Sequence, residues 1–250
     1  MHTRALVVML VREPAAGTVK TRLAPAFGAA GAAALYRAFV EDTCARLAPW
    51  VPLALAYAPA TPSGAAPPFV ATLARRHRLA VLPQRDGDLG ARMRAIVDTA
   101  LTSAAHVVLL GSDAPTLPLE HLRAALRALR RRAGTCATGS RMVLGPSLDG
   151  GYHLLGVRPP VPDVFTRMPW STDRVLARTL ARLRRARIEP VVLPPWYDVD
   201  TAADVDLLAR HLALLATLGE DPCPRTRRVL ARLRGARAPR RRACSGAAGR

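Results

Sequence analysis

Residues 5–23 read ALVVMLVREPAAGTVKTRL, an apolar run followed by a polar loop, from which we predict the start of the fold. Its first seven residues form an uninterrupted apolar run, which is typical of a β-strand buried on both faces. The run is far shorter than the ~20 residues that a membrane helix needs. Arg12, Glu13 and Pro14 close it at once, and no small-residue cleavage site of a signal peptide follows. The stretch therefore predicts a first strand and a polar loop in a cytoplasmic protein without a membrane segment.

Similar apolar runs recur along the chain and alternate with longer stretches of helical period. Strands are expected at 5–11, 53–58, 79–82, 106–110, 142–144, 152–157 and 190–193. Helices are expected at 29–47, 68–76, 89–104, 119–132, 172–187 and 202–218. This alternation predicts an α/β fold with one mainly parallel sheet that helices cover on both faces.

The charge is strongly basic and unevenly distributed. Lys and Arg number 37 against 18 Asp and Glu, a formal net charge of +19, and no acidic residue follows Asp221. From about Pro222 onward the composition turns to Arg, Ala, Gly and Pro. We expect a folded domain over 1–222 and an Arg-rich tail over 223–250 that is largely disordered, apart from a short helix at 227–233.

Aromatic residues make up only 4% of the chain, and no zinc-finger, helix-turn-helix or RNA-binding motif occurs. A specific nucleic-acid partner is therefore not expected. A non-catalytic module that binds polyanions through the tail stays open as an alternative.

Lys20 is the only lysine, since the other 36 basic residues are arginine. Lysine is a compact, rotatable point charge that suits phosphate. Pro14 and Gly17 shape the loop around it, and Lys20 with Arg22 could neutralise a di- or triphosphate. The loop is neither a Walker loop nor a dinucleotide fingerprint. An accidental surface lysine is the competing interpretation.

Carboxylates follow two further strands. In an open parallel sheet, ligands bind at the carboxyl ends of the strands. Asp113 lies there in the sequence GSDAP, and Asp200 follows the last strand. Mg²⁺ or Mn²⁺ is commonly held by one or two carboxylates together with substrate phosphates. The two residues therefore predict a metal site, with a plain turn as the alternative for Asp113.

Two glycine-containing loops could let the backbone approach a ligand. Residues 86–93 read DGDLGARM, where Asp88 suits a helix N-cap equally well. Residues 145–152 read GPSLDGGY, where Asp149 could bind a hydroxyl or take a proton, although Asp-Gly-Gly is also hairpin chemistry. Further along the chain, we expect Trp170 to line a pocket and Ser171 or Thr172 to cap a helix.

Other chemistries find little support in the sequence. The four cysteines are far apart and match neither a zinc module nor a disulfide scaffold. The six histidines show no metal-ligand spacing, and His153 is expected to be structural. No nucleophile elbow or His-Glu-x-x-His motif occurs.

Six short motifs in order carry a family resemblance: KTRL at 20–23, GDLG at 87–90, GSD at 111–113, DGGY at 149–152, WST at 170–172 and DVDT at 198–201. On these motifs, the chain from Ala5 to about Leu218 resembles the GT-A-fold nucleotide-diphospho-sugar transferase superfamily. It most resembles predicted transferases named for radical-SAM and selenium-domain neighbours, some assigned to arsenosugar biosynthesis. It is also similar to 2-phospholactate guanylyltransferases.

The resemblance implies a single GT-A domain and a metal-dependent glycosyltransferase that uses a nucleotide-diphospho-sugar donor and a small-molecule acceptor. The alternative is a nucleotidyltransferase that couples a nucleoside triphosphate to a phosphorylated small molecule and releases pyrophosphate. The implied catalytic residues are Lys20, Arg22, Asp113 and Asp149. Nucleotide binding falls to Arg12, Lys20, Arg22, Gly87, Asp88, Leu89, Gly90 and Arg92. Substrate binding falls to Asp149, Gly150, Gly151, Tyr152, Trp170, Ser171 and Thr172. Asp113 and Asp200 would hold Mg²⁺ or Mn²⁺.

Overall fold

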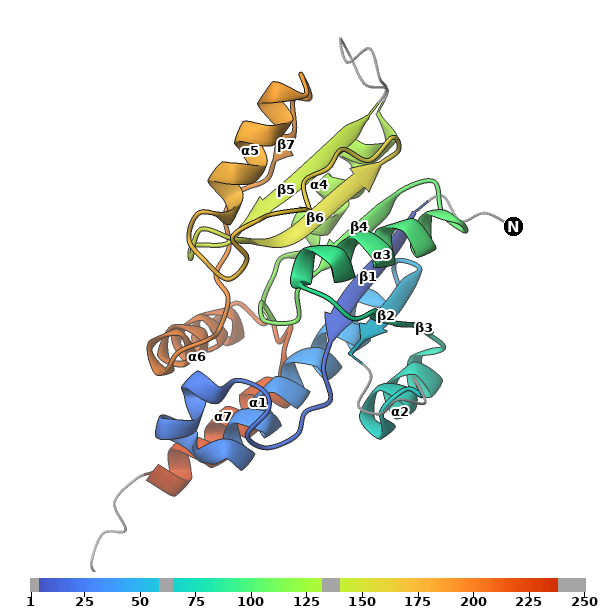
Figure 1. Ribbon diagram of the computed structural model, residues 1–250. Helices are drawn as coiled ribbons and strands as arrows, with labels where there is room; N and C mark the ends of the chain where they lie inside the picture. The colour runs from blue at the N-terminus through green and yellow to red at the C-terminus, as the bar shows by residue number, and fades with distance from the viewer. Residues whose placement is uncertain (1–4, 59–64, 132–139, 238–250) are drawn as a thin grey trace, which may run out of the picture.

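The computed structural model describes residues 5–58, 65–131 and 140–237, and within them seven strands form one sheet (Figure 1). The strand order is β3-β2-β1-β4-β6-β5-β7. β6 runs antiparallel to its neighbours β4 and β5, whereas the other described pairings are parallel. The strands are β1 Leu6–Val11, β2 Leu53–Tyr57, β3 Ala80–Pro83, β4 Val107–Leu110, β5 Arg141–Pro146, β6 Tyr152–Arg158 and β7 Val191–Val192. The predicted mainly parallel sheet is confirmed.

The helices are α1 Ala24–Leu47, α2 Pro68–His77, α3 Leu89–Leu101, α4 Leu119–Arg130, α5 Val175–Arg185, α6 Ala202–Thr217 and α7 Pro224–Arg237. A 3₁₀ turn, Thr21–Leu23, precedes α1. The predicted start of α5 is wrong, because the helix begins at Val175 with Arg174 as its N-cap residue. Ser171 cannot cap it, since its backbone is left-handed at φ 63°. The Thr172 hydroxyl donates to the Pro169 carbonyl at 2.7 Å.

Alternation along β1 explains why helices cover both faces of the sheet. Val7, Met9 and Val11 pack into a core with α1, α2 and α4. Val8 points to the other face, into a second core with α3 and α5. In Figure 1, α3 lies in front of the sheet and α4 behind it. The near-continuous apolar runs of the sequence therefore mark strands that are buried on both sides.

A third apolar cluster joins α1 to the C-terminal helices. Leu35 and Phe39 of α1 pack with Leu208 of α6 and with Cys223 and Leu230. α7 thus extends the packed body past the boundary predicted after residue 222, and it is longer than the helix predicted at 227–233. Residues 238–250, where disorder was predicted, lie outside the described residues.

Among the described residues, one helical stretch, Thr21–Leu47, is long and apolar enough to cross a membrane by length and composition alone. Half of its apolar window is buried inside the fold. Gly28 interrupts the helix with φ 72°, and Asp42 lies buried on it. These features agree with a core helix that separates two apolar clusters.

Candidate active site

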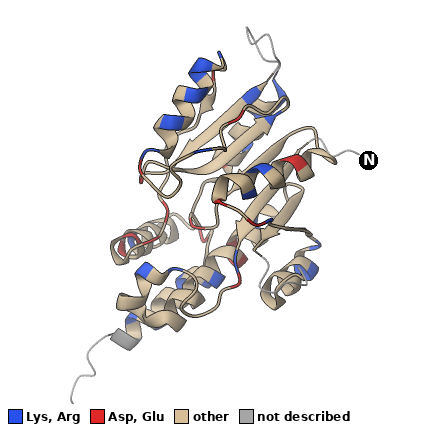
Figure 2. Cartoon of the chain, viewed as in Figure 1, with Lys and Arg blue, Asp and Glu red and all other residues tan. Residues whose placement is uncertain are grey.

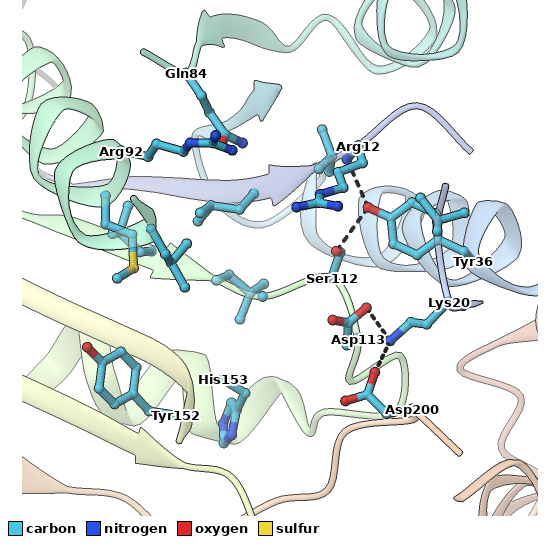
Figure 3. A pocket seen from close by; sticks show the side chains of 18 of the residues that line it. Arg12, Lys20, Tyr36, Gln84, Arg92, Ser112, Asp113, Tyr152, His153 and Asp200 are labelled. Carbon is cyan, nitrogen blue, oxygen red and sulfur yellow. Dashed lines mark hydrogen bonds and ion pairs between the residues drawn. The ribbon is translucent and has the colours of Figure 1, made fainter. Parts of the chain in front are cut away.

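A cavity of about 440 Å³ lies at the carboxyl ends of β1 and β4 (Figure 3). This is the edge at which an open parallel sheet binds its ligands. The volume falls within the roughly 300–1,000 Å³ of small-molecule sites. Arg12, Lys20 and Arg22 line it from the loop after β1, and Asp113 and Asp200 line it from two other loops. The structure thus brings together predicted residues that lie up to 188 positions apart in the sequence.

The Lys20 ammonium lies between two carboxylates. Its Nζ is 2.6 Å from Asp113 Oδ1 and 2.8 Å from Asp200 Oδ1. The lysine side chain is only 5% exposed, whereas the two aspartates are 40% and 38% exposed. Burial acts to lower the pKa of Lys20, but the two carboxylates outweigh it, so the pKa is raised and the amine stays charged.

Backbone geometry fixes all three groups. Lys20 adopts a left-handed conformation (φ 48°) immediately before the 3₁₀ turn. The carbonyl of Asp113 accepts a hydrogen bond from the Val199 amide at 2.9 Å, which joins the loop after β4 to the loop before α6. Asp200 precedes the capping box of Thr201 and Asp204 at the start of α6. The aspartates are therefore held on short, well-anchored segments.

The residues present fit a divalent cation. Asp113 and Asp200 each place one carboxylate oxygen against the Lys20 ammonium, and such hard oxygen ligands also suit Mg²⁺ or Mn²⁺. Within the described ranges, no group of three or more His, Cys, Asp or Glu is placed to hold a metal, so substrate phosphate and water would complete the shell. Asp198 adds a further acid close by, and its carboxylate accepts a 2.6 Å hydrogen bond from Ser147.

Asp198, in the motif DVDT, is a neighbouring acid that does not line the cavity and that the sequence prediction did not include. Its pKa is raised to about 7, chiefly by burial and also by the carboxylates of Asp113, Asp149 and Asp200. The hydrogen bond from Ser147 opposes this effect. Negative charge is therefore crowded at this end of the cavity.

A buried hydrogen-bond chain lies beside Lys20 and Asp113 (Figure 3). The Tyr36 hydroxyl accepts from the Arg12 amide at 2.9 Å and shares a 3.2 Å hydrogen bond with the Ser112 hydroxyl. Burial raises the pKa of Tyr36, so the phenol stays neutral. Gln84 also lines the cavity and donates to the Ala56 carbonyl at 2.9 Å. No motif marks Tyr36, which lies inside α1, or Gln84, which follows the edge strand β3.

Only some residues of the predicted nucleotide-binding loop line the cavity. Leu89 and Arg92 line the cavity, and the Arg92 guanidinium donates to the Gly87 carbonyl at 2.9 Å. Asp88 caps α3 by accepting from the Ala91 amide at 2.8 Å. Gly87, Asp88 and Gly90 are not lining residues.

Gly90 faces the protein's own chain. A Cβ on it would lie 2.2 Å from the Phe165 carbonyl oxygen and 2.6 Å from Trp170 Nε1. Its missing side chain therefore accommodates the segment before α5.

Of the predicted substrate group, Tyr152 alone lines the cavity. Asp149 Oδ1 accepts from the Gly151 amide at 3.0 Å, so this carboxylate closes the β5–β6 hairpin turn. A Cβ on Gly150 would lie 2.2 Å from the Asp173 carbonyl oxygen. Trp170 packs edge-on against Tyr152 at 6.4 Å between ring centroids. The hairpin interpretation of 145–152 is the one the structure supports.

His153 lines the cavity but is buried, and its Nδ1 lies 3.1 Å from the Pro146 carbonyl oxygen. Burial, together with the neighbouring His121, lowers its pKa to about 4. The imidazole is therefore neutral.

Comparison with solved structures agrees with this geometry. A predicted nucleotide-diphospho-sugar transferase from Desulfovibrio desulfuricans G20 is 31% identical, with a TM-score of 0.79 over 93% of this chain and 98% of that one. A cytidylyltransferase from Leptospira borgpetersenii serovar Hardjo-bovis (strain JB197) is 11% identical, with a TM-score of 0.56 over 94% and 95% of the two chains. The second likeness shows the fold alone. A search of curated proteins finds no match.

The fold is that of the nucleotide-diphospho-sugar transferases, and the chain is an enzyme of the transferase class. More narrowly, it belongs to the DUF2064 family, described as uncharacterized proteins conserved in bacteria, whose family model matches residues 42–172.

Proposed function

We propose that the protein is a metal-dependent glycosyltransferase that transfers a sugar from a nucleotide-diphospho-sugar to a small-molecule acceptor. One observation carries the proposal: Asp113, Asp200 and Lys20 meet in the cavity at the carboxyl ends of the parallel strands. The 31% identical relative, itself a predicted nucleotide-diphospho-sugar transferase, supports the same class of donor.

The cations of the cavity would bind the diphosphate. Lys20, Arg12 and Arg22 lie on one loop, and Arg92 enters from α3. As the bond between the sugar and the diphosphate breaks, negative charge builds up on the leaving nucleoside diphosphate, and fixed cations stabilise that charge. Asp113 and Asp200 would hold Mg²⁺ or Mn²⁺, which supplies further charge neutralisation when bound.

The acceptor would enter at the side of the cavity that Tyr152 lines. Trp170 supports the Tyr152 ring, while Asp149, Gly150 and Gly151 shape the hairpin before it, and Ser171 and Thr172 complete the neighbouring loop. Asp149 remains our candidate for orienting the acceptor hydroxyl or taking its proton. That role requires its carboxylate to leave the turn in which it accepts from Gly151.

A second candidate is nucleotidyl transfer from a nucleoside triphosphate to a phosphorylated small molecule. The observation in its favour is the number of cations: Arg12, Lys20, Arg22 and Arg92 all line one cavity, enough charge for a triphosphate. Both reactions rely on positioning and charge neutralisation, so the same residues would serve.

The sequence also resembles transferases with radical-SAM and selenium-domain neighbours and 2-phospholactate guanylyltransferases, and this resemblance supports the proposed function. We further propose a cytoplasmic location. A specific nucleic-acid partner is not part of it. Figure 2 shows basic residues on the outer helices, most densely along α5.

The test is a product assay with Mn²⁺ or Mg²⁺. The protein is incubated with nucleotide sugars, and separately with nucleoside triphosphates plus phosphorylated small molecules. Release of a nucleoside diphosphate from one nucleotide sugar, lost in Asp113→Asn and kept in the exposed control Asp98→Asn, is the expected result. Pyrophosphate release instead would establish the second candidate. Neither product over the whole panel would overturn both.

A further inference from the structure

Lys20 lies between the two carboxylates that would hold a metal ion. Its Nζ contacts the Oδ1 atom of both Asp113 and Asp200, at 2.6 and 2.8 Å. The lysine is nearly buried, while each carboxylate is more than a third exposed and lines the cavity. The two carboxylates are therefore held together by an internal cation before any ligand arrives.

Charge makes the arrangement unstable once a divalent ion enters. Two carboxylates and one ammonium carry a net charge of −1, which attracts a cation. With a divalent ion on the same carboxylates, the ammonium would face a like charge at short range, which repels it from that position. A diphosphate entering with the ion offers the ammonium a new partner of opposite charge.

The lysine side chain is suited to such a move. It is a flexible four-carbon stem with three rotatable donors. Lys20 lines the cavity together with Arg12 and Arg22, so rotation of its side chain keeps the ammonium beside the space in which the diphosphate would lie.

We propose that Lys20 substitutes for the divalent ion between Asp113 and Asp200 in the unloaded enzyme, and yields these carboxylates to the ion as it moves onto the substrate diphosphate. This inference rests on the proposed function. It makes Lys20 a positioning residue for the metal site before loading and a phosphate ligand after it.

The first test measures binding without catalysis. Mn²⁺ alone is titrated into wild type, Lys20→Met and Arg22→Met, with free Mn²⁺ followed by electron paramagnetic resonance. Arg22 lines the same cavity, and among the described ion pairs it is joined to neither aspartate, so it controls for the loss of one positive charge. We expect Lys20→Met to bind Mn²⁺ on the order of tenfold more tightly than wild type, and clearly more tightly than Arg22→Met.

For inorganic pyrophosphate, titrated with Mn²⁺ present, we expect the Lys20→Met substitution to change the affinity in the opposite direction. Lys20→Met should bind it about tenfold more weakly, because a charged phosphate partner is lost. A lysine that only supports the fold would weaken both ligands. Mn²⁺ affinity of Lys20→Met no higher than that of Arg22→Met overturns this inference and leaves the proposed function standing. Wild type that binds neither Mn²⁺ nor pyrophosphate overturns both.

A second measurement needs no substitution, because Lys20 is the only lysine. Wild type with ¹³C- and ¹⁵N-labelled lysine gives one side-chain signal by NMR. We expect saturating Mg²⁺ to shift that signal and pyrophosphate to shift it again. A Lys20 signal that stays unchanged while Mg²⁺ and pyrophosphate bind contradicts the exchange of partners.

Discussion

Lys20 and His153 are both nearly buried beside the same cavity, yet they are held in opposite charge states. Two carboxylates within 2.8 Å outweigh the burial of Lys20 and keep it charged. His153 has no such partner, and burial with the nearby His121 lowers its pKa to about 4. Of these two buried groups, only the one with carboxylate partners therefore keeps a positive charge that could bind a polyphosphate.

His153 should make the protein sensitive to acid. Its pKa falls from 6.5 to about 4 on folding, so the unfolded chain binds the proton more readily. The stability that follows from the neutral ring is complete above pH 6.5 and is lost as the pH falls towards 4, by up to about 1.4 kcal/mol per pH unit. Asn at this position can keep the hydrogen bond to Pro146 without titrating.

Urea unfolding of wild type and His153→Asn between pH 7.5 and 4.5 measures this effect. The variant should be less stable at pH 7.5, because a ring is lost from the core, but it should lose less stability on acidification. Parallel pH profiles for the two proteins would show that His153 does not carry the proton.

At the scale of elements, α3 depends on the contact of Gly90 with the segment before α5. Gly90→Ala should destabilise the protein by about 1–3 kcal/mol, because its Cβ would meet the Phe165 carbonyl at 2.2 Å. Gly235→Ala in α7 is the matched control, since its Cβ would meet nothing within 4 Å. That change should stabilise the helix by about 0.5–1 kcal/mol. Melting temperatures that move in the same direction would contradict this interpretation.

α7 is tied to the domain by a buried carboxylate. Asp42 of α1 accepts hydrogen bonds from the Arg225 and Thr226 amides at 3.2 and 2.8 Å. Asp42→Ala leaves these buried donors unpaired and should cost about 1–3 kcal/mol.

The control for Asp42→Ala is Asp206→Ala. Asp206 of α6 forms an exposed ion pair with Arg234 of α7, and the substitution removes this pair. It should change stability by less than about 1 kcal/mol. Denaturant midpoints compare the two variants, and equal losses would mean that α7 is not capped by Asp42.

The sequence predicts most elements because their signals are local. The apolar run of β1 and the capping box at Thr201 each identify an element without any tertiary contact. These local signals fail where contacts between residues far apart in the sequence determine the secondary structure. Composition favours a tail after residue 222, but α7 is capped by Asp42 and buries Leu230. The start of α5 is shifted by the left-handed backbone at Ser171.

The candidate site also contains residues that local sequence signals predict and residues that only tertiary packing places. Lys20, Asp113 and Asp200 follow strands, and parallel topology brings strand ends together, so sequence position alone predicts their meeting. Tyr36 is placed by the packing of α1 against the sheet, which no short motif records. The glycine loops mislead because glycine serves a tight turn or a close protein contact as readily as a ligand, as at Gly90 and Gly150.

For the whole molecule, the formal net charge of +19 predicts weak attraction to any polyanion. We expect two unrelated DNA duplexes to bind equally weakly at low salt, and binding to fall at least roughly tenfold between about 50 and 200 mM salt. Fluorescence anisotropy measures both. A sequence preference that survives at the higher salt would contradict the view that this charge serves no specific nucleic acid.

We propose that the cavity at Lys20, Asp113 and Asp200 is a metal-dependent nucleotide site. Thermal stabilisation by nucleotide sugars and nucleoside triphosphates, each with and without Mn²⁺, tests it most directly in wild type, Asp113→Asn and Asp98→Asn. We predict that one nucleotide ligand raises the melting temperature of wild type and Asp98→Asn only with Mn²⁺, and leaves Asp113→Asn unchanged. Stabilisation that is equal in Asp113→Asn, or absent from wild type throughout the panel, would show that this cavity is not a metal-dependent nucleotide site.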